Sequence, residues 1–224
     1  MKPLKSRNAQ PDEFLCFVCE RVDSARVFLD LLKKMIHVCQ GDQDLLLRKA
    51  IEENLHDERG VGKGKSASHD KWREDYLEGI QKLHHERVCC CDHTCHFVYK
   101  QVFRDAVMRG DKGEMLGVLL YLERVIPIEF AFIRSYQDKV FCGIFVYSQI
   151  DTHQQRAIKR KLRRYLDDHI VHDAVDHYPK LLQAIQLSGS DLSMQEKIAY
   201  GAKIIHRAKL LSYETHFRKR KTGV

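Results

Sequence analysis

Apolar residues recur every three or four positions along most of this chain, which is the spacing of one buried face of an α-helix. Strand-like alternation is rare, and the chain has only 12 glycines and 4 prolines. Leu, Lys, Glu, Arg and Ala, which favour helix, are frequent. The pattern predicts an all-α, single-domain helical bundle of about seven helices, at residues 12–39, 42–57, from about 68 to beyond 80, 94–110, 112–133, 152–186 and 193–217.

Three places complicate this pattern. Pro127 is expected to bend or interrupt the fifth helix, and Pro179 is tolerated in the long sixth helix only with a kink or a break. Residues 140–150 read as a short strand or a buried helix, and periodicity does not decide between them. The first eleven residues, ending at Pro11, are expected to be a disordered lead-in to one helical domain at residues 12–224.

Composition narrows the class of protein. With 224 residues the chain is long enough for one domain with a sizeable core. The formal charge of +7 is mild and partly local, so it does not call for nucleic acid. No apolar run approaches the roughly 18 to 20 residues of a membrane span, and the N-terminus lacks a signal-peptide core. We therefore expect a cytoplasmic protein whose eight cysteines are reduced.

Imidazole and carboxylate side chains follow one stripe of the predicted long helix. His169, Asp173 and His177 are four residues apart, so each step advances about 40° beyond a full turn and the three share one face over about 12 Å. This nitrogen and oxygen set suits Fe, Mn or Zn, although it also fits an exposed polar face. His172 and Asp176 form a competing pair in another register, which leaves Asp176 as the alternative to His177.

Two further regions place carboxylates or imidazole where helices meet. Glu123 continues the apolar face that runs through Leu116 and Leu119, so it is expected to be buried and either paired with an arginine or bound to a metal. Glu58 ends one helix before a Gly-rich loop, and His69 opens the next. Alone, that pair also fits a solvated glutamate and an exposed first-turn histidine.

Taken together, these regions give three carboxylates and three imidazoles on facing helices. Helical bundles build dinuclear iron centres from such side chains. The sequence therefore predicts a metal site formed by Glu58, His69, Glu123, His169, Asp173 and His177.

The same segments resemble those of the heme-oxygenase-like di-iron oxidases, the iron-containing redox enzymes of the TenA and PqqC structural superfamily. NLHDERGVGKGKSASH is similar to the family's first Glu-to-His motif, LGVLLYLERVIP to its Gly-to-Glu helix, and HIVHDAVDHYPKLLQAI to its His–Asp–His helix. GAKIIHRAKLLSYE resembles its closing helix, and the likeness runs over about residues 45 to 216.

The resemblance implies an all-helical fold and oxygen activation at two irons, with manganese an alternative in one site. Glu58, Glu123 and Asp173 would be the catalytic carboxylates among the six ligands. The implied partners are O₂, a small organic substrate of unknown identity and an external reductant, with no membrane or nucleic acid; a homodimer is left open. The alternative from another class is a non-catalytic helical binding or effector module that keeps the fold.

The cysteines offer a rival site. Cys16 and Cys19 form a CxxC pair, and a second cluster spans Cys89 to Cys95 among several histidines. A structural zinc site needs four such ligands, but Cys in an apolar helical pattern is more often a small buried residue. Cys142 is a weaker candidate for a nucleophile.

Overall fold

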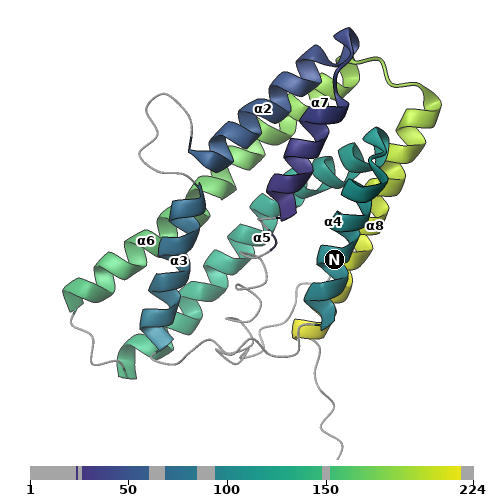
Figure 1. Cartoon of the computed structure of the whole chain (residues 1–224). Helices are drawn as coiled ribbons and strands as arrows, with labels where there is room; N and C mark the ends of the chain where they lie inside the picture. Colours follow the sequence, from purple (N-terminus) through teal and green to yellow (C-terminus); the bar gives the residue numbers. More distant parts are fainter. Residues whose placement is uncertain (1–23, 25–26, 61–68, 85–93, 148–151, 218–224) are drawn as a thin grey trace, which may run out of the picture.

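The computed structural model describes residue 24 and residues 27–60, 69–84, 94–147 and 152–217 (Figure 1). These residues are almost entirely helical and contain no strand, so the predicted all-α bundle is confirmed. After a helix at residues 27–38, the elements are a 3₁₀ turn at Asp42–Asp44, α2 (Leu45–Arg59), α3 (His69–His84), α4 (Thr94–Arg109), α5 (Lys112–Tyr147), α6 (Thr152–His172), a π turn (Asp173–His177), α7 (Tyr178–Leu187) and α8 (Leu192–Phe217).

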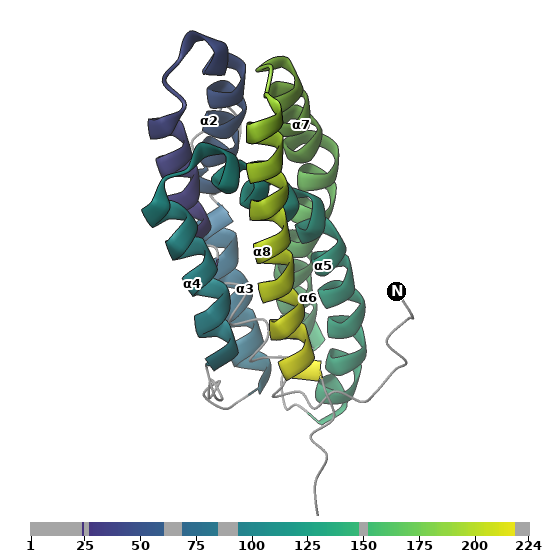
Figure 2. The same ribbon diagram turned by 90° about the vertical axis from the view of Figure 1, so that its right-hand side faces the viewer.

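The helices are arranged around α5. α6, the π turn and α7 follow one another as a single long rod, and α3 and α2 lie end to end along it, α3 against α6 and α2 against α7 (Figure 1). α8 packs along α5 on one side and contacts α4 on the other (Figure 2). The gap between α2 and α3 therefore lies opposite the junction between α6 and α7.

α5 is longer than the sequence predicts. It continues through Pro127 and on to Tyr147, so most of the ambiguous segment at residues 140–150 is helix, and the expected end near residue 133 is wrong. Pro127 has no N–H to donate to the carbonyl of Glu123, one turn earlier, but tight packing against α6 and α8 maintains the helix on both sides.

The long helix accommodates Pro179 without breaking. The five residues before α7 form the π turn, and Pro179 sits in the first turn of α7. A proline ring clashes with the carbonyl four residues earlier in a regular α-helix, and a wider π turn moves that carbonyl away. The expected kink or break is thus replaced by a local change of helix type.

α5 and α8 approach so closely that only glycine fits at their crossing. A Cβ atom built on Gly117 would lie 2.0 Å from the carbonyl oxygen of Ile198, and one built on Gly201 would lie 2.1 Å from the carbonyl oxygen of Glu114. This crossing fixes α5, and with it Glu123, relative to the rest of the bundle.

No helix among the described residues is both long enough and apolar enough to cross a membrane. The predicted lead-in at residues 1–11 lies outside the described residues, as do residues 12–23 of the first predicted helix.

Candidate metal centre

All six predicted ligands are buried, and they come from five elements: α2, α3, α5, α6 and the π turn. Glu58 lies in the last turn of α2, which ends at Arg59 before Gly60 with its left-handed φ of 68°, and His69 begins α3. Glu123 comes from α5, His169 from α6, and Asp173 and His177 from the π turn. Their exposed fractions lie between 2% and 6%. The alternative interpretations, in which Glu58 is solvated and His69 and the His–Asp–His face are exposed, are therefore wrong.

The structure sorts these residues into two groups of three. The first group is Glu58, His69 and His169, and the second is Glu123, Asp173 and His177; within each group the candidate ligand atoms lie within 4.8 Å of one another. Two ligands bound to one ion at about 2.1 Å and at right angles are roughly 3 Å apart. Both groups therefore have the dimensions of a metal site.

In the first group, His69 Nδ1 lies 3.1 Å from Glu58 Oε1. The second oxygen of Glu58 accepts a hydrogen bond of 3.3 Å from Arg73, which is itself buried. His169 stacks beside His69 at 4.4 Å between ring centroids, and its Nδ1 has no hydrogen-bond partner within the described part of the chain.

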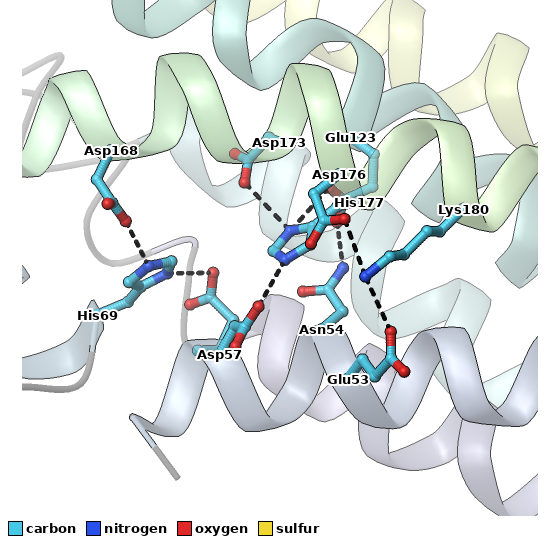
Figure 3. Close-up of polar contacts among 11 residues, drawn as sticks. Glu53, Asn54, Asp57, His69, Glu123, Asp168, Asp173, Asp176, His177 and Lys180 are labelled. Carbon is cyan, nitrogen blue, oxygen red and sulfur yellow. Dashed lines mark hydrogen bonds and ion pairs between the residues drawn. The ribbon is translucent and has the colours of Figure 1, made fainter. Parts of the chain in front are cut away.

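In the second group, His177 Nδ1 lies 3.2 Å from Asp173 Oδ1 and 3.6 Å from Glu123 Oε2 (Figure 3). The other oxygen of Glu123 accepts a hydrogen bond of 2.6 Å from Asn54, not from an arginine as the sequence had left open. Glu123 Oε2 has no hydrogen bond to any described residue.

Buried polar atoms without partners cost free energy, so each calls for an explanation. Glu123 Oε2 and His169 Nδ1 are one such atom in each group. A carboxylate oxygen and an imidazole nitrogen are also ligand atoms that iron accepts. The two groups therefore fit the pair of ions that the sequence predicts.

Two aspartates outside the six predicted ligands complete the surroundings of the histidines. His69 Nε2 lies 3.0 Å from Asp168, and His177 Nε2 lies 3.1 Å from Asp57. The side chain of Asp168 is only 28% exposed, because His69 reaches across from α3 to meet it.

His177 and Asp176, the two alternatives for the sixth ligand, lie in different surroundings. His177 lies with Glu123 and Asp173, whereas Asp176 has a side chain 34% exposed and forms an ion pair of 2.9 Å with Lys180. Asp176 and Asp57 approach His177 in a group separate from the one formed by Glu123 and Asp173.

Carboxylates on both sides of His69 change the charge of the first group. Burial alone lowers the pKa of His69, but its hydrogen bonds to Asp168 and Glu58 outweigh burial and raise that pKa to about 9. Burial raises the pKa of Glu58, yet the bond from His69 and the nearby positive charges bring it down to about 2. Burial and the charge of His69 lower the pKa of His169 to about 3, so His169 is neutral.

Neighbouring carboxylates also raise the pKa of the histidine in the second group. Burial lowers the pKa of His177, but its bonds to Asp173 and Asp57 and the nearby charge of Glu123 outweigh burial and raise that pKa to about 12. Burial, aided by the charge of Glu123, raises the pKa of Asp173 to about 7 despite the bond to His177. Without metal, His69 and His177 are thus the cations that keep the buried carboxylates together.

Both groups face one cavity of about 60 Å³, large enough for a few water-sized molecules. Glu58 and His169 line it from the first group, and Glu123 and Asp173 from the second. Much of the remaining wall is aromatic or aliphatic: Phe28, Tyr99, Phe103, Leu122, Ile126, Phe130 and Tyr165. A small molecule in this cavity would touch both groups in largely apolar surroundings.

The rival cysteine sites cannot be compared with this geometry. Cys16, Cys19 and Cys89–Cys91 lie outside the described residues. Cys95 and Cys142 fall in α4 and α5, but their side chains lie outside the description.

Comparison of the chain with protein-family models, with curated proteins and with solved structures finds no match. The resemblance to heme-oxygenase-like di-iron oxidases therefore stays a prediction, carried by the residues of this chain.

His177→Ala is expected to remove about half of the bound metal, because it takes the only imidazole from the second group. Asp176→Ala, one residue earlier and outside both inner groups, is the matched control and should leave metal content unchanged. Metal per chain, measured by elemental analysis after loading, checks both variants. Loss of metal in Asp176→Ala but not in His177→Ala would mean that the other register holds the ligand.

Proposed function

We propose that this protein is a non-heme di-iron oxidase or oxygenase that activates O₂ to oxidise a small organic substrate. The observation that carries the proposal is the pair of buried three-residue groups facing one cavity. The first group has two imidazoles and one carboxylate, a composition used by non-heme iron(II) oxygenases. Carboxylates and imidazoles from facing helices are also how helical bundles hold two irons.

The charges support two divalent ions. Three carboxylates and two ferrous ions leave a net charge of +1 once the histidines have lost their extra protons. The two ions would then replace the protonated His69 and His177 in neutralising three buried carboxylates, which a buried site requires. With three protein ligands for each ion, each ion would also have room to bind a small molecule.

Each protein residue has a defined task in this proposal. Glu58, Glu123 and Asp173 bind the irons, with Arg73 orienting Glu58 and Asn54 orienting Glu123. The aromatic wall excludes water from the reacting molecules. When bound, the irons would supply electrons to O₂. Inserting one oxygen atom into a C–H bond and reducing the other to water takes two electrons and two protons besides the C–H bond pair, so an external reductant is needed to provide these two electrons.

The proposal includes the cellular compartment and the identity of the metal. Ferrous iron and reductants are available in the cytoplasm, where cysteines stay reduced, and we assign the protein to that compartment. Manganese in one of the sites is compatible with the same ligands.

One observation favours a second candidate. Arg73 is buried against Glu58, and an arginine beside a buried carboxylate is also how a purely structural polar network is stabilised. In that case the same residues would belong to a non-catalytic helical binding or effector module.

Anaerobic loading with ferrous ion distinguishes the di-iron enzyme from the non-catalytic module. The di-iron proposal expects about two irons per chain and a visible absorption band that develops only after O₂ is admitted. Glu123→Ala should reduce iron to about one per chain with helical content intact, because it removes a ligand from the second group only. Glu114→Ala is the control on the same helix: Glu114 pairs with Arg109, outside both groups. Absence of iron uptake by the wild type would favour the structural network.

A further inference from the structure

The same arrangement occurs twice around the candidate metal centre. In each group one histidine lies between inner carboxylates, on its Nδ1 side, and an outer aspartate, on its Nε2 side (Figure 3). For His69 the outer residue is Asp168, and for His177 it is Asp57. Each contact joins different elements, α3 to α6 and the π turn to α2.

A histidine that binds a metal uses one ring nitrogen and donates the N–H of the other. The acceptor of that N–H selects the tautomer, fixes the plane of the ring and makes the ligand nitrogen more basic. An aspartate 3.0 or 3.1 Å from Nε2 is such an acceptor. The nitrogen left facing the inner carboxylates is Nδ1 in both residues.

We infer that Asp168 and Asp57 are positioning residues that hold His69 and His177 with Nε2–H outwards, so that both histidines bind metal through Nδ1. The inference rests on the metal binding proposed above and does not depend on the oxygen chemistry. It distinguishes these histidines from His169, for which no carboxylate contact is seen among the described residues. The ring of His169 is instead held against Phe130 and Tyr165, at 4.8 and 4.7 Å between centroids.

The surroundings of Asp57 argue against its acting as a ligand itself. Asp57, Asp176 and the outer side of His177 do lie close enough together to suggest a further ion site. However, Lys180 Nζ lies 2.9 Å from Asp176 and 3.1 Å from Glu53, which places a positive charge beside that group. A cation there would have to displace the lysine, whereas on the inner side Glu123 and Asp173 offer carboxylates without a lysine or arginine contact among the described residues.

Cobalt(II) is a suitable probe, because its paramagnetism shifts the proton resonances of bound imidazoles away from the rest of the spectrum. In water the cobalt-loaded wild type should show shifted, slowly exchanging N–H signals from His69 and His177 that vanish in D₂O. Asp168→Ala should abolish one signal and Asp57→Ala the other, because the N–H loses its acceptor. Each should also weaken cobalt binding by about 10- to 100-fold.

Conservative variants separate positioning from other roles. Asp168→Asn and Asp57→Asn keep an oxygen that accepts the N–H bond, so both should retain the signal and recover most of the affinity. Asp167→Ala is the matched control: it removes a carboxylate one residue from Asp168, paired with Arg134, and should change neither signal nor affinity.

The outcomes distinguish this inference from the proposed function. If the wild type binds neither cobalt nor iron, the metal centre itself is wrong. If cobalt binds but both alanine variants keep their signals and bind within twofold of the wild type, the positioning role is overturned. If Asp57→Asn binds cobalt as poorly as Asp57→Ala, Asp57 is a ligand and not a positioning residue.

Discussion

The metal-free protein is expected to lose stability as the pH rises from about 6.5 to 9, while its affinity for divalent ions rises. Folding raises the pKa of His69 from 6.5 to about 9 and that of His177 to about 12. Across this interval the folded chain therefore holds protons that the unfolded chain has released. A state that binds more protons is favoured by low pH, so raising the pH favours unfolding.

Below pH 6.5 His169 and Asp173 act in opposite directions, and Glu58, with its pKa lowered to about 2, adds a loss of stability as the pH falls below about 4.5. His169, with its pKa lowered to about 3, rejects a proton that the unfolded chain accepts, so the protein loses stability as the pH falls. Asp173, with its pKa raised to about 7, holds a proton that the unfolded chain releases, which stabilises the fold as the pH falls from 7 towards 3.8. The larger and simpler change is therefore expected above pH 6.5.

The affinity for metal is expected to change with pH in the opposite direction to the stability of the metal-free protein. An ion at Nδ1 of His69 or His177 displaces a proton from each ring, so loading both sites releases about two protons, and a further one from Asp173 where the pH lies below its pKa of about 7. The combined affinity of the two sites should then rise by up to about a hundredfold per pH unit. Calorimetric titrations with manganese between pH 6.5 and 8, in buffers of different ionisation enthalpy, count the protons released.

Urea unfolding of the metal-free chain between pH 6.5 and 9 measures the other half of this prediction. His56→Gln, a change to an exposed histidine on α2, should leave the slope against pH unchanged. His69→Gln and His177→Gln should each flatten it. A wild-type stability that stays constant or increases over this range would show that these histidines are not paired with carboxylates.

Gly117→Ala is expected to destabilise the protein by about 3 kcal/mol or more. In an open helix the same change would stabilise by up to about 1 kcal/mol, because alanine is the better helix former. Here the new methyl group would lie 2.0 Å from the carbonyl oxygen of Ile198, and backbone cannot rotate away as a side chain can. α5 and α8 must separate, which also displaces Glu123.

Gly41→Ala provides the matched comparison. The three atoms nearest to a Cβ there all belong to the side chain of Gln43, which can move, so the effect on unfolding in urea should be small. Unchanged stability in Gly117→Ala would mean that α5 and α8 do not cross at this close distance.

The sequence could predict what depends on local spacing. The apolar period identified the helices, and a glutamate in phase with Leu116 and Leu119 had to be buried, as Glu123 is. The predicted helix ends on either side of the Gly-rich loop similarly indicated Glu58 and His69. All six residues could be selected in this way because each breaks, or borders, an apolar pattern.

What the sequence could not predict depends on contacts between distant segments. Asp168 and Asp57 look like ordinary surface residues, since their partners His69 and His177 lie 99 and 120 positions away along the chain. The passage of α5 through Pro127 depends on helices packed against it, not on local preference. The π turn was missed because a regular 3.6-residue period was assumed throughout the long helix.

The π turn has a consequence for how such a site is gained or lost. A π turn accommodates one residue more than α-helix of the same length, and the surplus is on the outside here, at the exposed Ala174 and Val175. Deleting a single codon there would let the rod continue as plain α-helix, with Leu181 and Ile185 still facing the core. His177 would then follow Asp173 by three positions instead of four. The packing of the bundle and the position of His177 relative to Asp173 therefore depend on different features of the chain, and a change of one residue in length would alter the second while leaving the first.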